Sequence, residues 1–173
     1  MEKVLLSKYF YIISPKQSDK INFTVSSMDD PNAIPFLGRS STNNGIVDYV
    51  KKEDGLVNEG GVITIALDGS TGSTFYQHHN FSSGQNIWIL KPKEDYLPGG
   101  LTPLIALFLV TTIRKAAESY TYNLSLTKTR LSNLQIFLPL DQDGKIDVDY
   151  INNRMKKLRN VNLLENISDK RIV

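Results

Sequence analysis

The sequence contains no cysteine among its 173 residues. This absence excludes thiol nucleophiles, thiolate zinc sites, iron–sulfur clusters and disulfide frameworks, and it agrees with a reducing compartment. Long apolar runs are also missing, since the most continuous one covers only residues 104–110, whereas a membrane helix needs about 20. The first residues turn polar at Ser7 and Lys8, which predicts no signal peptide. We therefore expect one cytoplasmic domain with a single apolar core and no membrane partner.

A strong excess of charge of either sign is absent too, because 20 Lys and Arg stand against 18 Asp and Glu. The charges are unevenly placed, however. Residues 1–100 carry a net charge of −2 and residues 101–173 carry +4, with a local +3 in residues 111–130. This distribution is typical of a weak positive electrostatic field that attracts a polyanion. It is equally typical of a helix face exposed to solvent.

Strands and turns dominate the first hundred residues. Runs of β-branched and aromatic residues predict strands at residues 4–13, 21–25, 34–39, 46–50, 62–67 and 86–90. Asn44-Gly45 favours a hairpin between the third and the fourth of these. Thr102 before Pro103 predicts the start of a buried helix at about residues 103–119, and Asp147 predicts the start of a C-terminal helix at about residues 148–159. The predicted class is α+β, a single domain with a twisted, mostly antiparallel β-sheet.

No catalytic constellation is present in the sequence. The only histidines, His78 and His79, are adjacent and are expected on opposite faces of a strand, so they do not indicate a metal site. The acidic turn at residues 141–147 resembles a calcium loop, but its first and last ligand positions are Pro139 and Tyr150. Gly-x-Ser-x-Gly is absent as well. We expect no catalytic residue, no metal and no cofactor.

Polar side chains gather in the predicted loops. The loop of small residues at 69–74 allows a ligand to approach the backbone, although a plain tight turn explains it equally well. Arginine, asparagine and glutamine have forked groups that can recognise base edges, and lysine and hydroxyl groups suit phosphates. Residues of these types favour nucleic acid over a small molecule, and they are Arg39, Asn43, Asn44, Ser70, Ser73, Thr74, Tyr76, Gln77, Gln85, Asn86, Lys128 and Arg130.

Three stretches, in this order, carry a resemblance to a known family. They are Ile34-Pro35-Phe36-Leu37-Gly38-Arg39 with Asn43-Asn44-Gly45, then Ile65-Ala66-Leu67-Asp68-Gly69-Ser70-Thr71-Gly72-Ser73-Thr74-Phe75-Tyr76-Gln77, and then Arg130-Leu131 leading to Ile136-Phe137-Leu138-Pro139. Together they resemble the target recognition domain of the DNA specificity subunits of type I restriction–modification systems and of the related type IIG enzymes. The resemblance covers roughly residues 30 to 160, and the second stretch is the most distinctive.

The resemblance implies a non-catalytic protein that binds a specific sequence of double-stranded DNA. Methylation and cleavage would take place in methyltransferase (modification) and restriction subunits, which would be its partners. The loops at residues 39–44 and 69–77 would face the major groove, and Lys128 and Arg130 would hold the DNA backbone. The DNA-binding residues that it implies are Arg39, Asn43, Asn44, Asp68, Gly69, Ser70, Ser73, Thr74, Tyr76, Gln77, Lys128 and Arg130.

The sequence departs from that family in one respect. Subunits of the family commonly carry two recognition domains joined by two long helices, and this chain has one. Residues 1–145 would form the recognition domain, and residues 146–173 would form the start of a spacer or dimerisation helix and a tail. The chain is then either a half subunit that forms a homodimer through its C-terminal helix or a domain of a larger protein.

Two other functions remain open from the sequence. One is a protein-interaction domain that joins methyltransferase or specificity subunits without recognising DNA. The other, least favoured, is a small-molecule enzyme built on the loop at residues 68–77, because the sequence offers no base, nucleophile or metal set for catalysis there.

Overall fold

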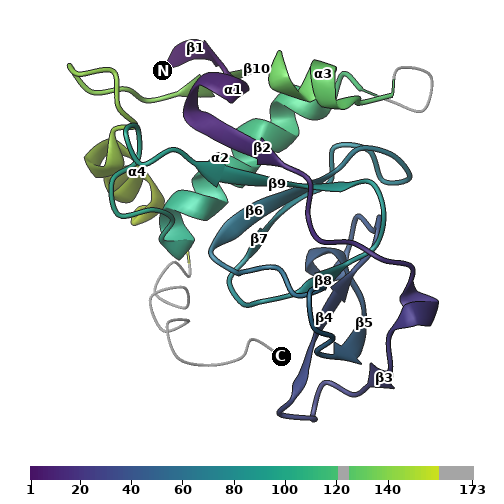
Figure 1. Ribbon diagram of the computed structural model, residues 1–173. Coiled ribbons are helices and arrows are strands. Elements are labelled where there is room, and N and C mark those ends of the chain that lie inside the picture. Colours follow the sequence, from purple (N-terminus) through teal and green to yellow (C-terminus); the bar gives the residue numbers. More distant parts are fainter. Residues whose placement is uncertain (121–124, 160–173) are drawn as a thin grey trace.

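The strands form three sheets in the computed structural model, which describes residues 1–120 and 125–159 (Figure 1). A two-stranded sheet pairs β1 (Glu2–Leu5) with β10 (Gln135–Leu138). The main sheet has the order β2 (Phe10–Ile13), β9 (Ile87–Pro92), β6 (Val62–Ala66), β7 (Thr74–Gln77). The small sheet has the order β3 (Val25–Ser26), β5 (Ile46–Lys51), β4 (Ala33–Leu37), β8 (Ser82–Ser83).

The predicted α+β class is confirmed, but the strands are divided among three sheets where one was expected. Strand pairing is mostly antiparallel, as predicted, and β4 with β8 is parallel. The predicted hairpin is confirmed as well, since β4 pairs antiparallel with β5 across the short turn η2 (Asn43–Gly45).

The two longer helices begin where the sequence predicts. α2 (Pro103–Ala117) has Thr102 as its N-cap, whose hydroxyl accepts a hydrogen bond from the Ile105 N–H. α4 (Val148–Met155) has Asp147 as its N-cap, whose carboxylate accepts from the Tyr150 N–H. Their ends come earlier than expected. α4 stops at Met155, and Leu158 beyond it is 52% exposed, so Leu158 does not continue the apolar face of the helix.

The main sheet lies between α2 and the small sheet. Because side chains alternate along a strand, Ile63 and Ile65 of β6 face the buried side of α2, which carries Leu109 and Ile113. Val62 points the other way. It forms a second cluster that reaches from the main sheet to the small sheet and consists of Leu37, Val62, Phe81, Ile87 and Ile89. Helix α2 and the two sheets thus fix the loops at the ends of β6, β4 and β9 relative to one another.

α4 packs on α2 and belongs to the same core. Ile151 is fully buried and Met155 is 7% exposed, and both lie in the cluster that surrounds α2. The proposed boundary between residues 145 and 146 stays a prediction. Residues 160–173, the rest of the predicted spacer and tail, lie outside the described residues.

Two predicted strands are interrupted. Between β1 and β2 the chain makes a single helical turn, α1 (Leu6–Tyr9), because Leu6 and Tyr9 are both buried there and the turn carries the chain from one sheet to the next. The segment 21–25 holds the end of a 3₁₀ turn, η1 (Lys20–Asn22), and only the start of β3.

A short helix, α3 (Lys128–Ser132), was not predicted, since five residues are too few to show an apolar period. Within residues 1–120 and 125–159, no helix is long and apolar enough to cross a membrane.

Candidate nucleic-acid interface

Three loops meet at the carboxylate of Asp68. Arg39, which follows β4, places Nη1 at 3.0 Å from both Oδ1 and Oδ2 of Asp68. Asn86, just before β9, donates from Nδ2 to Oδ2 at 2.7 Å. Asp68 itself lies in the connection from β6 to β7. The two neighbours of Asp68 are 29 and 18 residues away in the sequence, so the packing of the two sheets brings this cluster together.

The backbone on both sides of Asp68 brings its carboxylate close to Arg39 and Asn86. Gly69 has a φ of +64°, which a residue with a side chain rarely adopts, and a Cβ added there would lie 3.0 Å from Cβ of Arg39. The N–H of Leu67 donates to the carbonyl of Asn86 at 2.9 Å. A backbone hydrogen bond therefore ties the loop to the residue before β9, and the loop approaches Arg39 so closely that a side chain at position 69 would be strained.

The Arg39–Asp68 pair is half exposed, with 47% of the arginine side chain and 43% of the aspartate side chain accessible. Nη1 is the guanidinium nitrogen that contacts the carboxylate. Among the residues that the structure describes, Nε and Nη2 of Arg39 make no hydrogen bond. The carboxylate thus orients the guanidinium while two of its nitrogens remain available to a ligand.

The turn of the β4–β5 hairpin is held to β7 by amide groups. Asn44 Nδ2 donates to the carbonyl of Tyr76 at 3.0 Å and to Oε1 of Gln77 at 3.2 Å. Gln77 Nε2 returns a hydrogen bond to the Asn44 carbonyl at 3.1 Å and donates to Thr64 Oγ1 at 3.0 Å. Asn43 remains exposed at the surface, with its amide donating to the Ile46 carbonyl at 3.0 Å.

Two of the predicted DNA-binding side chains lie inside the fold. Gln77 is 3% exposed and Thr74 is fully buried, with its hydroxyl donating to the Gly72 carbonyl at 2.8 Å. In this conformation these buried side chains support the loop from inside the fold. Ser70 and Ser73 are partly exposed on it, and Gly69 is exposed. The sequence pattern alone does not separate the two groups, because all of them are polar residues near a strand end.

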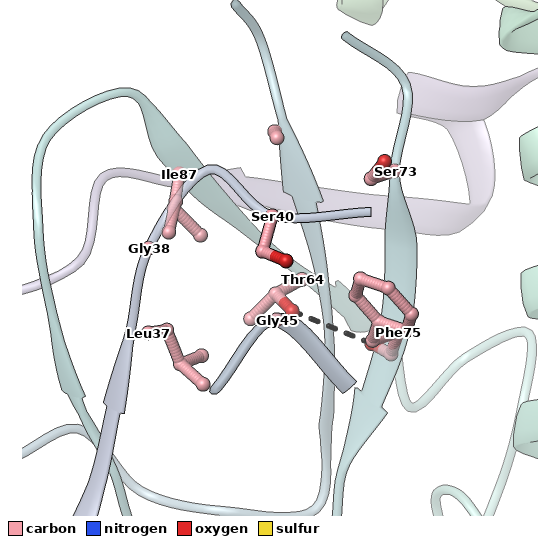
Figure 2. A pocket seen from close by; sticks show the side chains of 9 residues that line it. Leu37, Gly38, Ser40, Gly45, Thr64, Ser73, Phe75 and Ile87 are labelled. Carbon is pink, nitrogen blue, oxygen red and sulfur yellow. Dashed lines mark hydrogen bonds between the residues drawn. The ribbon is translucent and has the colours of Figure 1, made fainter. Parts of the chain in front are cut away.

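Phe75 connects the loop to helix α2. The Arg114 guanidinium lies 5.0 Å from the centroid of the Phe75 ring and donates to the Thr74 carbonyl. Gly45 lies on another side of the ring, since a Cβ added there would be 3.4 Å from it. Figure 2 shows the small hollow beside this ring, with the hydroxyl-bearing side chains Ser40, Thr64 and Ser73 in its lining. Thr64 Oγ1 donates to the Phe75 carbonyl at 3.5 Å, the dashed line in that view.

A larger groove of about 290 Å³ begins at Arg39. It lies between η1 and the loops that precede β5 and β9, and it is lined by Asp19, Lys20, Phe36, Gly38, Arg39, Gly84 and Gln85. Gln85 donates to Asp19 at 3.0 Å and Lys20 donates to Asp48 at 2.8 Å. Lys20, which lines this groove, is not among the predicted residues, since nothing in its sequence surroundings links it to the later loops.

Lys128 lies at the same end of the main sheet as Asp68. Its ammonium group is 5.1 Å from the ring centroid of Trp88. Trp88 pairs with Ile65, close to the end of β6 that leads into Asp68, and is two residues from Asn86. Arg130 is exposed in α3, and its Nη1 donates to the Ser125 carbonyl at 2.6 Å. Lys128 therefore lies over the side of the main sheet on which Trp88 packs with the core around α2, and Arg130 is anchored within its own segment.

The histidines do not lie as expected. Both follow the end of β7, and their rings contact edge to face with centroids 4.6 Å apart, because the strand alternation has already ended there. His78 Nδ1 lies 3.3 Å from the Tyr76 hydroxyl, and burial raises the pKa of Tyr76 above its usual value near 10. In the described part of the chain, no three His, Asp or Glu side chains cluster in a way that could hold a metal ion.

Exposed forked side chains from separate loops define a surface suited to recognising nucleic acid. A comparison with known protein families agrees with a nucleic-acid-binding protein. The sequence matches the type I restriction modification DNA specificity domain over residues 16–168. The chain therefore belongs to this family, which confirms the family that its ordered motifs resemble.

Individual relatives support the same assignment. The chain is 28% identical over 127 residues to the type II restriction enzyme specificity subunit S.BcgI of Heyndrickxia coagulans, covering 73% of this chain and 36% of that protein. The fold is similar to the type I restriction–modification S subunit of M. genitalium, with a TM-score of 0.59, 15% identity, and coverage of 95% of this chain and 39% of the other.

A second solved structure, the HsdS subunit of Thermoanaerobacter tengcongensis, has a TM-score of 0.54 at 20% identity, covering 98% of this chain and 40% of that subunit. At these identities the structural matches show the fold alone. The chain spans well under half the length of each of these three proteins.

Proposed function

We propose that this chain binds a specific sequence of double-stranded DNA in the cytoplasm and directs the methyltransferase and restriction subunits that modify or cleave it. The observation that carries the proposal is the convergence of Arg39, Asp68 and Asn86, from three separate loops, on an exposed surface at the end of the main sheet. Such a surface, held by a rigid scaffold, is where recognition side chains concentrate in many folds.

Each predicted residue then has a place in binding. Arg39 and Asn43 lie on the exposed surface and would face base edges in the major groove, with Asp68 orienting Arg39. Asn44 would hold the hairpin turn in place through its amide. The loop at residues 69–73 offers its backbone and the hydroxyls of Ser70 and Ser73 to the DNA. Thr74, Tyr76 and Gln77 would shape that loop. Lys128 and Arg130 would contact phosphates, so binding should weaken steeply with rising salt.

Selection of bound fragments from a random pool of DNA duplexes tests this function. The chain is used alone and together with a methyltransferase subunit, and we expect a short sequence to be enriched. Arg39→Ala should change or abolish the enrichment. Lys91→Ala removes one positive charge from an exposed position further along β9, five residues from Asn86, and should leave it unchanged. A wild-type protein that enriches no sequence in either arm would contradict the proposal and favour a protein-interaction domain.

For assembly we propose a homodimer formed through the C-terminal helix, which would restore the two recognition domains of longer relatives. Ile151 and Met155 are buried against α2, so the contact would use the exposed side of α4, including Tyr150, and the residues that follow. Solution mass tests this directly. We expect a dimer that Leu158→Glu dissociates, whereas a wild-type monomer would favour a domain that acts within a larger assembly.

A further inference from the structure

We propose that Arg39 recognises one guanine of the target through the Nε–Nη2 edge of its guanidinium, which Asp68 and Asn86 hold in position. The inference rests on the proposed DNA-binding function and adds to it a named base and a named pair of donor atoms.

The geometry of the ion pair leaves one edge of the guanidinium open. Nη1 lies 3.0 Å from both Asp68 oxygens. Nε and Nη2 form the opposite edge, where two N–H groups point in parallel. In the major groove only guanine offers two adjacent acceptors, O6 and N7, whereas adenine pairs one acceptor with a donor, thymine offers one acceptor and a methyl group, and cytosine offers a donor. The free edge therefore matches guanine.

A phosphate would also match two parallel donors, but the charge at this position disfavours it. The two carboxylate oxygens of Asp68 stand within hydrogen-bond distance of the same guanidinium, so the pair is neutral as a whole. An anionic phosphate on the open edge would face the negative charge of Asp68 across the guanidinium. A neutral base edge on the open side would not be repelled by Asp68.

Asp68 is itself held before DNA arrives. Its Oδ2 accepts from Asn86 Nδ2 at 2.7 Å, and Gly69 approaches Arg39 so closely that an added Cβ would lie 3.0 Å from Cβ of Arg39. The long arginine side chain thus loses part of its freedom in the free protein. This preorganisation lowers the entropy cost of ordering Arg39 on a base.

The first test compares the enriched sequences of wild type, Arg39→Ala and Arg39→Lys. We expect a guanine at one position in the wild-type motif. Arg39→Ala should lose the preference at that position, keep the other positions, and bind the wild-type site roughly 5- to 150-fold more weakly, the range for a lost bidentate contact. Arg39→Lys should weaken the preference without abolishing it, because an ammonium group can donate to O6 and N7 but lacks two parallel N–H groups.

The second test changes the base and not the protein. At the position that Arg39→Ala no longer specifies, 7-deazaguanine removes the N7 acceptor in the major groove, and inosine removes only the amino group in the minor groove. We expect 7-deazaguanine to weaken binding of wild type but not of Arg39→Ala. Inosine, the matched control, should leave both nearly unchanged.

The third test addresses Asp68 as a positioning residue. Asp68→Asn keeps the shape of the side chain and removes its charge, so the guanine preference should weaken without disappearing, and the salt dependence of binding should become steeper as Arg39 turns toward phosphates. Asp95→Asn, at an exposed position, is the control and should change neither quantity. Circular dichroism checks that both variants fold.

The outcomes separate the two proposals. A motif whose guanines all survive in Arg39→Ala would overturn this inference and leave the proposed function standing. Uniformly weaker binding of Arg39→Ala to every duplex, with the motif intact, would assign Arg39 to a phosphate and overturn the inference in the same way. A wild-type protein that enriches no motif would overturn the proposed function and this inference with it.

Discussion

The core around α2 and the loop cluster around Asp68 are built in opposite ways. Leu109, Ile113 and Ile65 are fully buried and packed among other apolar side chains. Arg39 and Asp68 are half exposed and are joined by directional hydrogen bonds. Burial of apolar area stabilises a fold without regard to direction, whereas an exposed ion pair adds little stability but fixes an orientation. The difference indicates that the core holds the chain folded, whereas the loop cluster orients the side chains that we propose to contact DNA.

The two regions meet at the last turn of α2. Arg114 donates to the Thr74 carbonyl and stacks on Phe75, and Gly72 approaches Ala117 so closely that an added Cβ would lie 3.0 Å from its side chain. The loop therefore takes its position from the helix. Substitutions in the core should therefore lower mainly the free energy of unfolding, whereas substitutions in the loop cluster should change mainly DNA binding.

The largest loss of stability is expected for Leu109→Ala. Leu109 is fully buried on α2, and removing its methyl groups should lower the free energy of unfolding by about 3 kcal/mol, through lost burial and the cavity left behind. Urea denaturation measures this. The control Lys115→Ala, on the exposed side of the same helix, should change it by less than about 0.5 kcal/mol. A loss below 1 kcal/mol for Leu109→Ala would contradict the proposed role of this core.

A smaller loss is expected for Gln77→Leu, which keeps much of the side-chain volume and removes the amide. Thr64 Oγ1 and the Asn44 carbonyl would each lose the hydrogen bond that the Gln77 Nε2 donates, at a cost of about 1 to 3 kcal/mol. Urea denaturation again gives the value, and Gln142→Leu, at an exposed turn, is the matched control. Equal stability of the two variants would mean that the buried amide network does not hold the hairpin turn.

Arg39→Ala should affect stability less than either change and affect DNA binding most. Its ion pair with Asp68 is half exposed, so the free energy of unfolding should fall by less than about 1 kcal/mol. The same variant should lose the guanine preference at one position of the enriched sequence and bind the wild-type site more weakly. Denaturation and duplex selection on one protein preparation check both results. A loss of stability as large as that of Leu109→Ala would remove the distinction between the two regions.

The smallest effect concerns pH. A hydrogen bond from Lys20, followed by one from the Tyr49 N–H, lowers the pKa of Asp48 below its usual value. A carboxyl whose folded pKa is lowered contributes stability above its unfolded pKa, about 4, and that contribution is lost as the pH falls through the folded value. Because Lys20 is half exposed, we expect less than about 1 kcal/mol. Lys20→Ala should flatten the stability profile between about pH 5 and pH 2 relative to wild type, and an unchanged profile would contradict this.

Much of the fold follows from local patterns. The caps at Thr102 and Asp147, the β4–β5 hairpin and the apolar strand β6 are each set by neighbouring residues and were predicted correctly. The turn α1 was not, because Leu6 and Tyr9 become helical only where they fill the core between two sheets. The division of the strands into three sheets depends likewise on long-range pairing that a local pattern does not contain.

The candidate site shows the same division. Residue types alone mark Arg39, Asp68 and Asn86 as polar loop residues, and the ordered motifs at residues 34–45 and 68–77 indicate the family, which the match over residues 16–168 confirms. Only the tertiary structure brings these three side chains to one carboxylate and turns Thr74 and Gln77 inward. The physical reason is that propensity, capping and motif depend on near neighbours, whereas burial and ion pairing depend on which distant strands the core holds side by side.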